Sequence, residues 1–425
     1  MRVIRFFILI LIAGIVGYYI GVNKISFDWK QYKPSISVVN KEPPSSLSNL
    51  DMDRFWTVFQ KVQEGYYDKK AIDADKMLNG AITGMVNSLD DPYTVFLPPT
   101  QNKDFKQMLS GQFSGIGAEL GLRDKQVVVV APIDGSPAQK AGIKSGDAIL
   151  KVNDDATSGW TLTQTVEKIR GPKGTQVALT VQHKNESTEK IIKIIRDTIT
   201  VKSVAAWVKE VGAIDQINKP AALSAHQKDK IAYIRLSQFG DNTNQEWLTT
   251  INALSLDMQK KGAVKGLILD LRNNPGGYVN DAVFIASEFL KMGSPVVIQD
   301  YGSGKEESLV VKRGGLLMNT PLVVLINKGS ASASEIVAGA LRDYDRATLV
   351  GEQSFGKGTM QNAEDLGNGS GIHVTIARWL TPKKSWVGNG KNGEGLKPDI
   401  VVTLDSKDQS HDAQLEKAVE ILTKK

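Results

Sequence analysis

One serine and one lysine, 25 positions apart, are the residues of this chain best suited to catalysis. Ser332 lies where an apolar strand-like run ends in a turn of small residues, just before a helical pattern that begins near Ser334. The start of a helix presents unpaired N–H groups and a partial positive charge. An oxyanion formed by attack of the Ser332 hydroxyl would find donors there, foremost the N–H of Ala333. The plainer interpretation is a serine that only caps the helix.

A serine nucleophile needs a base, and Lys357 is the candidate. Its neighbours Gly356 and Gly358 let the backbone approach another segment closely. If the chain is extended after the lysine, Thr359 and Gln361 point to the same side as Lys357, so Gln361 is able to hold the amine. A general base must be neutral, which requires burial to lower the lysine pKa from about 10.4 to about 7 or 8.

A different serine competes for the same lysine. Ser354 and Lys357 spell S-x-x-K, the pattern of β-lactamases and penicillin-binding proteins, where both residues share one helical turn. Gly356 and Gly358 make a helix unfavourable at this point. A phosphate-binding lysine is also disfavoured, because no Walker-type spacing accompanies it.

A third stretch offers the second half of an oxyanion hole. In LILDLRNNPGGYV, residues 267–279, a buried strand runs into a turn with two glycines before a helix. Either Gly276 or Gly277 is able to offer a backbone N–H without a side chain in the way. The turn is equally typical of a simple helix entry.

These stretches together resemble the C-terminal processing peptidases, also called tail-specific proteases. GSASASE followed by FGKGTMQ and preceded by DLRNNPGG is similar to the signature of that family, and the resemblance runs from about residue 51 to 399. In the family, the spacing to the lysine selects Ser332 over Ser330 and Ser334, which residue chemistry alone leaves open. The resemblance implies a nucleophile, a general base, an orienting amide and oxyanion donors: Ser332, Lys357, Gln361, and Ala333 with Gly276 or Gly277.

The family also places a PDZ domain before the protease core. The stretch FSGIGAEL, residues 113–120, looks like the carboxylate-binding loop of such a domain, and residues 135–154 are similar to its middle part. Backbone N–H groups of this loop would bind the C-terminal carboxylate of a peptide that joins the sheet as an extra strand: Gly115, Ile116, Gly117 and Ala118. Arg170 is a candidate for coupling the domain to the core, although such an arginine is usually only solvated.

The periodicity predicts a multi-domain α/β chain. We expect a small helical domain over 51–110 whose apolar stripe packs in a core, a PDZ domain over 111–197, a protease core over 198–405 and a C-terminal helix or tail over 406–425. In the core, strands are predicted at 230–236, 266–271, 295–299, 322–326, 348–351 and 371–380, with helices at 279–291 and 334–342. The resemblance implies a crotonase/Clp-protease-like layered sheet with helices, into which residues 211–229 look inserted.

The first 25 residues predict a transmembrane helix that acts as a signal anchor. Residues 6–22 carry no charge and follow Arg2 and Arg5, which favours a cytoplasmic N-terminus. A cleavable signal peptide is the alternative. Residues 26–50 contain Pro34, Pro43 and Pro44 and are typical of a linker. The catalytic domain is therefore expected outside the cytoplasm, at the cell membrane, or secreted or periplasmic if the signal is cleaved.

Composition excludes several other kinds of site. None of the 425 residues is cysteine, which excludes disulfides and a cysteine nucleophile. His183, His226, His373 and His411 show no metal-ligand spacing, and we expect no metal or cofactor. The net charge of +6 comes from basic residues scattered among acidic ones, so nucleic acid is not an expected partner.

The sequence thus predicts a serine endopeptidase with a Ser/Lys pair that cuts through an acyl-enzyme. Its expected partners are non-cytoplasmic proteins with apolar C-terminal tails and the membrane, with a homo-oligomer possible. Two alternatives remain: a non-catalytic PDZ scaffold or chaperone, and an acyl transferase that uses Ser354.

Overall fold

The computed structural model describes residue 14, residues 25–30 and 33–38, and residues 51–424 except 124–125, 134, 184–185, 219–220, 389–393 and 405–410. The helix predicted over 6–22 lies outside the described residues apart from Gly14. Among the residues that are described, no helix has the length and apolar character needed to span a membrane. The chain forms two compact units, Met1–Pro99 with Ala363–His373, and Thr100–Asn362 with Val374–Lys425.

The first unit holds the helical region and differs from expectation in two ways. Part of the expected linker forms an antiparallel hairpin of β1 (Ile25–Lys30) and β2 (Lys33–Val38), whose alternating apolar residues suit strands better than the prolines suggested. Helix α2 (Asp53–Gly65) was expected to pack in a core, yet none of its residues is buried and Trp56 is 58% exposed. The described part of this unit offers α2 no second apolar layer.

The rest of the first unit is short. A 3₁₀ turn (η2, Lys69–Ala71) leads to helix α3 (Ala74–Asn87), whose N-terminus is capped by the Asp73 carboxylate accepting from Lys76 N. Strand β3 (Val95–Leu97) then pairs antiparallel with the start of β20 (Gly371–Leu380).

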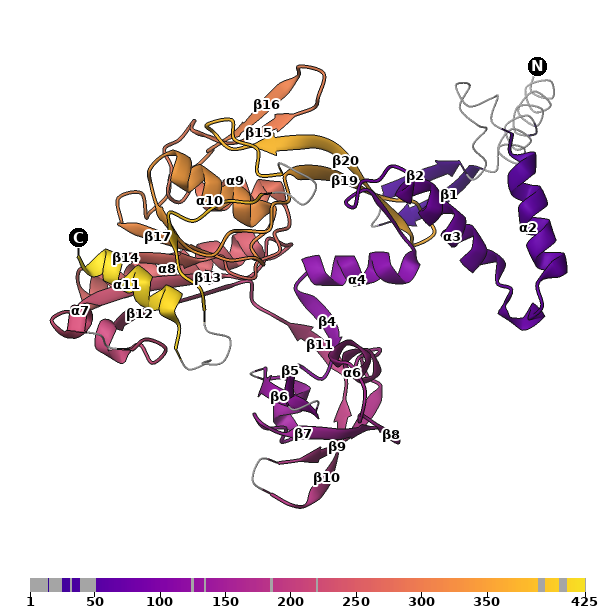
Figure 1. Cartoon of the computed structure of the whole chain (residues 1–425), viewed down its shortest axis with the longest axis horizontal. Coiled ribbons are helices and arrows are strands. Elements are labelled where there is room, and N and C mark those ends of the chain that lie inside the picture. The colour runs from indigo at the N-terminus through magenta and orange to yellow at the C-terminus, as the bar shows by residue number, and fades with distance from the viewer. Residues whose placement is uncertain are drawn as a thin grey trace, which may run out of the picture. The chain divides into compact units, whose positions relative to one another are not determined.

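The second unit begins with α4 (Pro99–Leu109) and a sheet with two short helices, as expected for a PDZ domain (Figure 1). Strand β4 (Gln112–Gly115), at the start of this domain, pairs with β11 (Asp197–Thr200), at its end. The main sheet has the order β10 (Glu189–Ile195), β9 (Gln176–Gln182), β7 (Ala148–Val152), β6 (Gln126–Pro132) and β5 (Ala118–Arg123), with β8 (Asp155–Ala156) on β7. Helices α5 (Pro137–Lys140) and α6 (Leu162–Ile169) complete it, the latter started by a capping box of Thr161 and Gln164.

The remainder of the second unit, which was expected to be the protease core, is built on a mostly parallel sheet. Its order is β12 (Val204–Glu210), β13 (Lys230–Leu236), β14 (Gly266–Asp270), β17 (Leu322–Ile326), β18 (Thr348–Gly351) and β21 (Ile400–Val401), with only β12 antiparallel to its neighbour. Every residue of β14 and β17 is buried, because helices cover both faces of the sheet.

One face of this sheet packs against three helices and the other against the C-terminal helix. Helices α8 (Thr243–Lys261), α9 (Val279–Ala286) and α10 (Ala333–Asp343) share a core with alternate strand residues such as Leu267 and Val324. The intervening residues, such as Ile268, face α11 (Ala413–Thr423). The segment that looked inserted joins this second core through η3 (Val211–Ala213), α7 (Ala221–Ser224) and four buried apolar residues: Val211, Ile214, Ile217 and Leu223.

A buried cluster of charges ties α11 to the sheet. The guanidinium of Arg272 donates to both carboxylate oxygens of Asp270, which is completely buried, and to Asp412 just before α11. Tyr233 also donates to Asp270. Because each charge in the cluster has a partner, its burial is tolerated.

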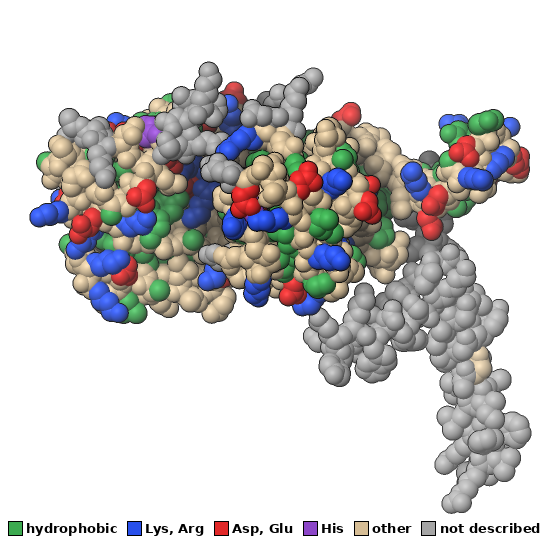
Figure 2. Space-filling view, turned by 90° about the horizontal axis from the view of Figure 1, so that it is seen from below, with side chains coloured by type: hydrophobic (Ala, Val, Ile, Leu, Met, Phe, Trp, Pro, Cys, Tyr) green, Lys and Arg blue, Asp and Glu red, His purple; other side chains and the backbone are tan. Residues whose placement is uncertain are grey.

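A second, antiparallel sheet lies beside the parallel one in the core. Its order is β16 (Glu306–Val310), β15 (Pro295–Asp300), β20 and β19 (Thr359–Asp365). Figure 1 shows β19 and β20 as a long pair that follows α10 and β18 in the chain. On the face drawn in Figure 2, basic and acidic side chains are interspersed. The segment between β18 and β19 carries Lys357 and brings it to the start of α10.

Candidate active site

Ser332 occupies the position that directly precedes α10 and follows β17. Its φ of 53° is rare for a residue with a side chain, so the backbone here is held in a strained conformation by its surroundings. The serine is partly exposed, whereas the residues on both sides of it are buried. Ser332 thus places a partly accessible hydroxyl at the start of a helix, as a nucleophile requires.

The neighbouring serines are engaged in holding the backbone. The hydroxyl of Ser330 donates to Leu271 O at 2.8 Å, and that of Ser334 donates to Asn274 O at 2.8 Å; both side chains are fully buried. Of these three serines, Ser332 is the one whose side chain is partly exposed.

The S-x-x-K alternative does not fit the structure. Ser354 is buried, donates to Glu335 Oε1 at 2.6 Å and accepts from Leu396 N at 2.6 Å. Residues 353–358 form no helix, so Ser354 and Lys357 do not share a helical turn.

A buried carboxylate, Glu335, joins the serine segment to the lysine segment. Its Oε2 accepts from Ser332 N at 2.7 Å and from Lys357 N at 3.0 Å, while its Oε1 accepts from Ser354 Oγ and from Gly356 N at 2.7 Å. Because both N–H groups end on one oxygen, the backbone nitrogens of Ser332 and Lys357 lie within about 6 Å of each other. Burial is the largest influence on the Glu335 carboxyl and raises its pKa, against the hydrogen bonds that lower it.

Further contacts fix the lysine segment. Phe355 N donates to Ser330 O at 2.9 Å, and the indole of Trp379 donates to Lys357 O at 2.8 Å. A Cβ at Gly358 would lie 2.3 Å from Trp386 Nε1, so only glycine fits beside that indole. The side chain of Lys357 is partly buried.

The candidate oxyanion donors lie against the serine. A Cβ added to Gly276 would lie 2.8 Å from the Cβ of Ser332 and 3.0 Å from Ala333 N. The N–H of Gly276 donates to Asn274 Oδ1 at 2.9 Å and is therefore in use. Within the described residues, the N–H groups of Gly277 and Ala333 donate no hydrogen bond. Of the two glycines, Gly277 is thus the one with an N–H to offer.

Gln361 lies on β19 with its amide held by two threonines. Its Nε2 donates to Thr359 Oγ1 at 2.9 Å and to Thr375 Oγ1 at 3.2 Å, the latter on β20. Thr359 and Gln361 therefore share one side of an extended strand, as expected. The amide oxygen of Gln361 is the group able to accept from an amine.

The loop expected to bind a carboxylate links β4 to β5, a strand at the edge of its sheet. It comprises Gly115 to Ala118, and its shape is fixed because the carbonyls of Ile116 and Gly117 accept from Ala138 N and Ile133 N. At Gly117 φ is 75° and a Cβ would lie 2.5 Å from that of Ser136, so glycine is required. Arg170 ends α6 with its guanidinium 5.3 Å from the ring centroid of Phe113.

Comparison with known proteins decides the family. Carboxy-terminal processing protease CtpA of Bacillus subtilis (strain 168) is 36% identical over 360 residues, which cover 85% of this chain and 71% of the relative. The chain belongs to the carboxy-terminal processing proteases. CtpB of the same organism is 33% identical over 397 residues, covering 92% of this chain and 75% of that one.

Three protein-family models match successive parts of this carboxy-terminal processing protease. Peptidase family S41 matches residues 230–402, a PDZ domain matches 106–182, and the N-terminal domain of the activating protease CtpB matches 11–100. A putative S41 protease from Bacteroides fragilis NCTC 9343 shares the fold with a TM-score of 0.55 at 16% identity, over 91% of this chain and 98% of that one. The expected combination of a PDZ domain with an S41 serine protease core is confirmed.

Sequence reasoning missed the carboxylate at the centre of this protease's candidate site. Glu335 is three residues after Ser332, and S-x-x-E before an apolar helix is the pattern of a capping box. That pattern announces that the glutamate bonds the backbone N–H of the serine. It does not reveal that the other donors come from a segment about 20 residues further along the chain.

Proposed function

We propose that this carboxy-terminal processing protease is a serine endopeptidase with Ser332 as nucleophile and Lys357 as general base. The Ser332 hydroxyl attacks a peptide carbonyl while the Lys357 amine takes its proton. The N–H groups of Ala333 and Gly277 stabilise the oxyanion, and the lysine returns the proton to the leaving amine. Water then hydrolyses the acyl-enzyme with the same lysine as base.

The observation that supports this mechanism most is the single oxygen of Glu335 that holds Ser332 N and Lys357 N together. Two residues that are 25 positions apart would have no reason to share one buried carboxylate oxygen unless their relative placement mattered. Gln361 stands on the strand that continues from the lysine and completes the set by orienting the amine.

We further propose that the substrates are non-cytoplasmic polypeptides captured by their C-terminal tails. The loop from Gly115 to Ala118 would bind the tail carboxylate and β5 would pair with the tail as an added strand. An anchor formed by residues 6–22 would hold the enzyme at the membrane with its catalytic domain outside the cytoplasm.

The mechanism is tested by mass spectrometry on an unfolded substrate with an apolar C-terminal tail. We expect Ser332→Ala and Lys357→Ala each to lower the cleavage rate at least about 1000-fold, while binding of a fluorescent tail peptide persists. The matched controls are the exposed residues Ser308 and Lys383, whose alanine variants should cleave at the wild-type rate. Cleavage that survives Ser332→Ala but is abolished by Ser354→Ala would refute the assignment. Tail binding without cleavage by any folded preparation would favour a non-catalytic scaffold.

A further inference from the structure

A cavity of about 450 Å³ adjoins the proposed catalytic groups. One wall comes from the start of α9, where Tyr278 directly follows Gly277, and another from β19, where Gln361 itself lines the cavity. The remaining lining residues are Val279, Asn280, Asp281, Gln299, Leu309, Met360 and Ile376. A side chain of a substrate held at Ser332 would therefore have this cavity within reach. This inference rests on the proposed function.

The cavity is lined by a buried carboxyl, Asp281, one of whose two oxygens has no hydrogen-bond partner among the described residues. Asp281 is 7% exposed, and its Oδ1 accepts from Asn244 Nδ2 at 2.7 Å. Its Oδ2 and the Oδ1 of Asn244 are buried without a hydrogen bond in the described part of the chain. Buried acceptors in native proteins nearly always have a donor, and an unmet one costs about 1–3 kcal/mol. The site therefore lacks a donor that a ligand is able to supply.

The surroundings of this carboxyl are negative. Among the described residues that line the cavity, none is Lys, Arg or His. The hydroxyl of Tyr278 donates to a second carboxylate, Asp241, at 2.9 Å. Burial, with the charge of Asp241 as a smaller cause, raises the pKa of Asp281 to about 6, so that it is ionised at neutral pH.

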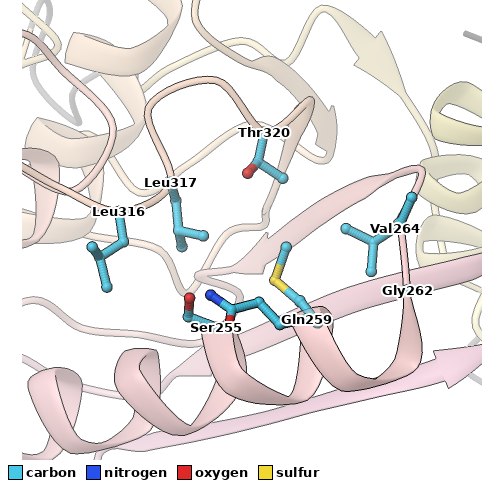
Figure 3. Close-up of a pocket in the computed structure, with 9 residues that line it drawn as sticks. Ser255, Gln259, Gly262, Val264, Leu316, Leu317 and Thr320 are labelled. Carbon is cyan, nitrogen blue, oxygen red and sulfur yellow. The ribbon is translucent and has the colours of Figure 1, made fainter.

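The position of Asp281 in the fold does not by itself explain these features. An acid in the first turn of α9 benefits from the partial positive charge of the helix start. That stabilisation does not require the acid to be buried. It therefore explains neither the burial of Asp281 nor its unpaired oxygen. A second pocket gives a contrast: it lies toward the C-terminal end of α8, about 20 Å along the helix from Asn244, and has no ionisable lining residue (Figure 3).

We propose that the cavity is a specificity subsite for a lysine or arginine side chain of the substrate near the scissile bond, with Asp281 as the specificity-determining residue. The apolar residues Val279, Met360 and Ile376 would cover the aliphatic stem. The cationic head would lie against the Asp281 carboxylate and, once this side chain turns toward the cavity, would donate a charge-assisted hydrogen bond to Oδ2, which is otherwise buried. An acidic substrate side chain would be repelled by the Asp281 carboxylate.

The test is a series of unstructured peptides with one common tail, in which each position around the cleavage site carries Lys, Arg, Met or Glu in turn. We expect one position at which wild-type kcat/KM at pH 8 is about 10- to 100-fold higher for Lys than for Met. In Asp281→Asn this ratio should fall below about threefold. Asp281→Ser, a second variant without the carboxylate, should lose the preference for Lys in the same way. The control is Asp257→Asn, which changes a carboxylate paired with Lys261 on α8 and should keep the wild-type ratio.

A binding experiment separates this inference from the proposed function. Ser332→Ala protein is titrated with Lys and Met peptides whose C-terminus is amidated, so that the PDZ loop has no carboxylate to bind. We expect about tenfold tighter binding of the Lys peptide, and loss of that difference in the Ser332→Ala, Asp281→Asn double variant. Cleavage without a basic preference at any position would overturn the subsite and leave the function standing. If the protein binds the Lys peptide more tightly but the wild type cleaves no peptide, the subsite would stand and the proposed function would be overturned.

Discussion

Replacement of Glu335 is the most direct test of how the site is held together. Alanine at this position leaves four donors without their acceptor: the N–H groups of Ser332, Gly356 and Lys357 and the hydroxyl of Ser354. Hydrogen bonds to a charged group contribute about 1.5–3 kcal/mol each. Loss of the two that end on Oε2, which fix the serine against the lysine, removes at least about 3 kcal/mol of positioning, or about 100-fold in kcat.

Glutamine should be milder, because it keeps one acceptor oxygen. The Ser354 hydroxyl can rotate and accept from the new NH₂ group, whereas a backbone N–H cannot. The amide should therefore turn its NH₂ toward Ser354 and leave its oxygen to Ser332 and Lys357. Gly356 N and the hydroxyl proton of Ser354 then lose this acceptor, and we expect kcat to fall about tenfold.

The assay measures kcat and KM with the model substrate, tail binding by fluorescence anisotropy and unfolding by differential scanning fluorimetry. If Glu335 has a positioning role, kcat should decrease from wild type to Glu335→Gln and further to Glu335→Ala, while the affinity for the tail peptide stays unchanged. The exposed Glu189→Ala is the control and should match wild type. The reasoning is refuted if folded Glu335→Ala keeps kcat within about threefold of wild type.

Two further predictions concern stability. Arg272→Ala should destabilise the fold by about 3–5 kcal/mol, because it leaves Asp270 buried without its main cation and frees Asp412 from the sheet; chemical denaturation that gives less than about 1 kcal/mol would contradict this. Asp281→Asn should stabilise the protein at pH 8 by about 1–3 kcal/mol, because the folded pKa of about 6 exceeds the ordinary 3.8 and the ionised form therefore costs free energy. Since that cost arises between pH 4 and 6, the gain should vanish at pH 4, and an equal gain at both pH values would show that the charge of Asp281 is not its cause.

The elements of the core follow closely from local sequence. Strands β13, β17 and β18 of the parallel sheet begin and end where apolar runs and turn residues predict, because a strand covered on both faces is mostly apolar. Strand β20 also has the predicted bounds, although part of it is exposed. The helix after Ser332 is likewise announced by its capping pattern. Strand β12 (VAAWVKE) was not predicted, since half of it is exposed and its pattern is weak.

Where packing rather than pattern decides, local sequence misleads. The apolar stripe of α2 predicted a buried face, but burial needs a second layer, and the described part of its unit supplies none. The prolines before it predicted a linker, although the antiparallel pairing of β1 and β2 shows strands there. The helix predicted over residues 6–22 lies outside the described residues and remains a prediction.

The sequence by itself determined the family and predicted the catalytic residue types, because the two motifs are short, contiguous and carry their own turn chemistry. Only the tertiary structure decided that Ser330, Ser334 and Ser354 are bound to the backbone or to Glu335. It also decided that, among the described residues, the N–H of Gly276 has an acceptor and that of Gly277 has none. It further decided that Glu335 joins both motifs and that Oδ2 of Asp281 has no donor in the described part of the chain. The physical reason is that hydrogen-bond pairing depends on segments far apart in the chain. Local sequence patterns therefore do not encode which donors and acceptors are paired and which are left unpaired.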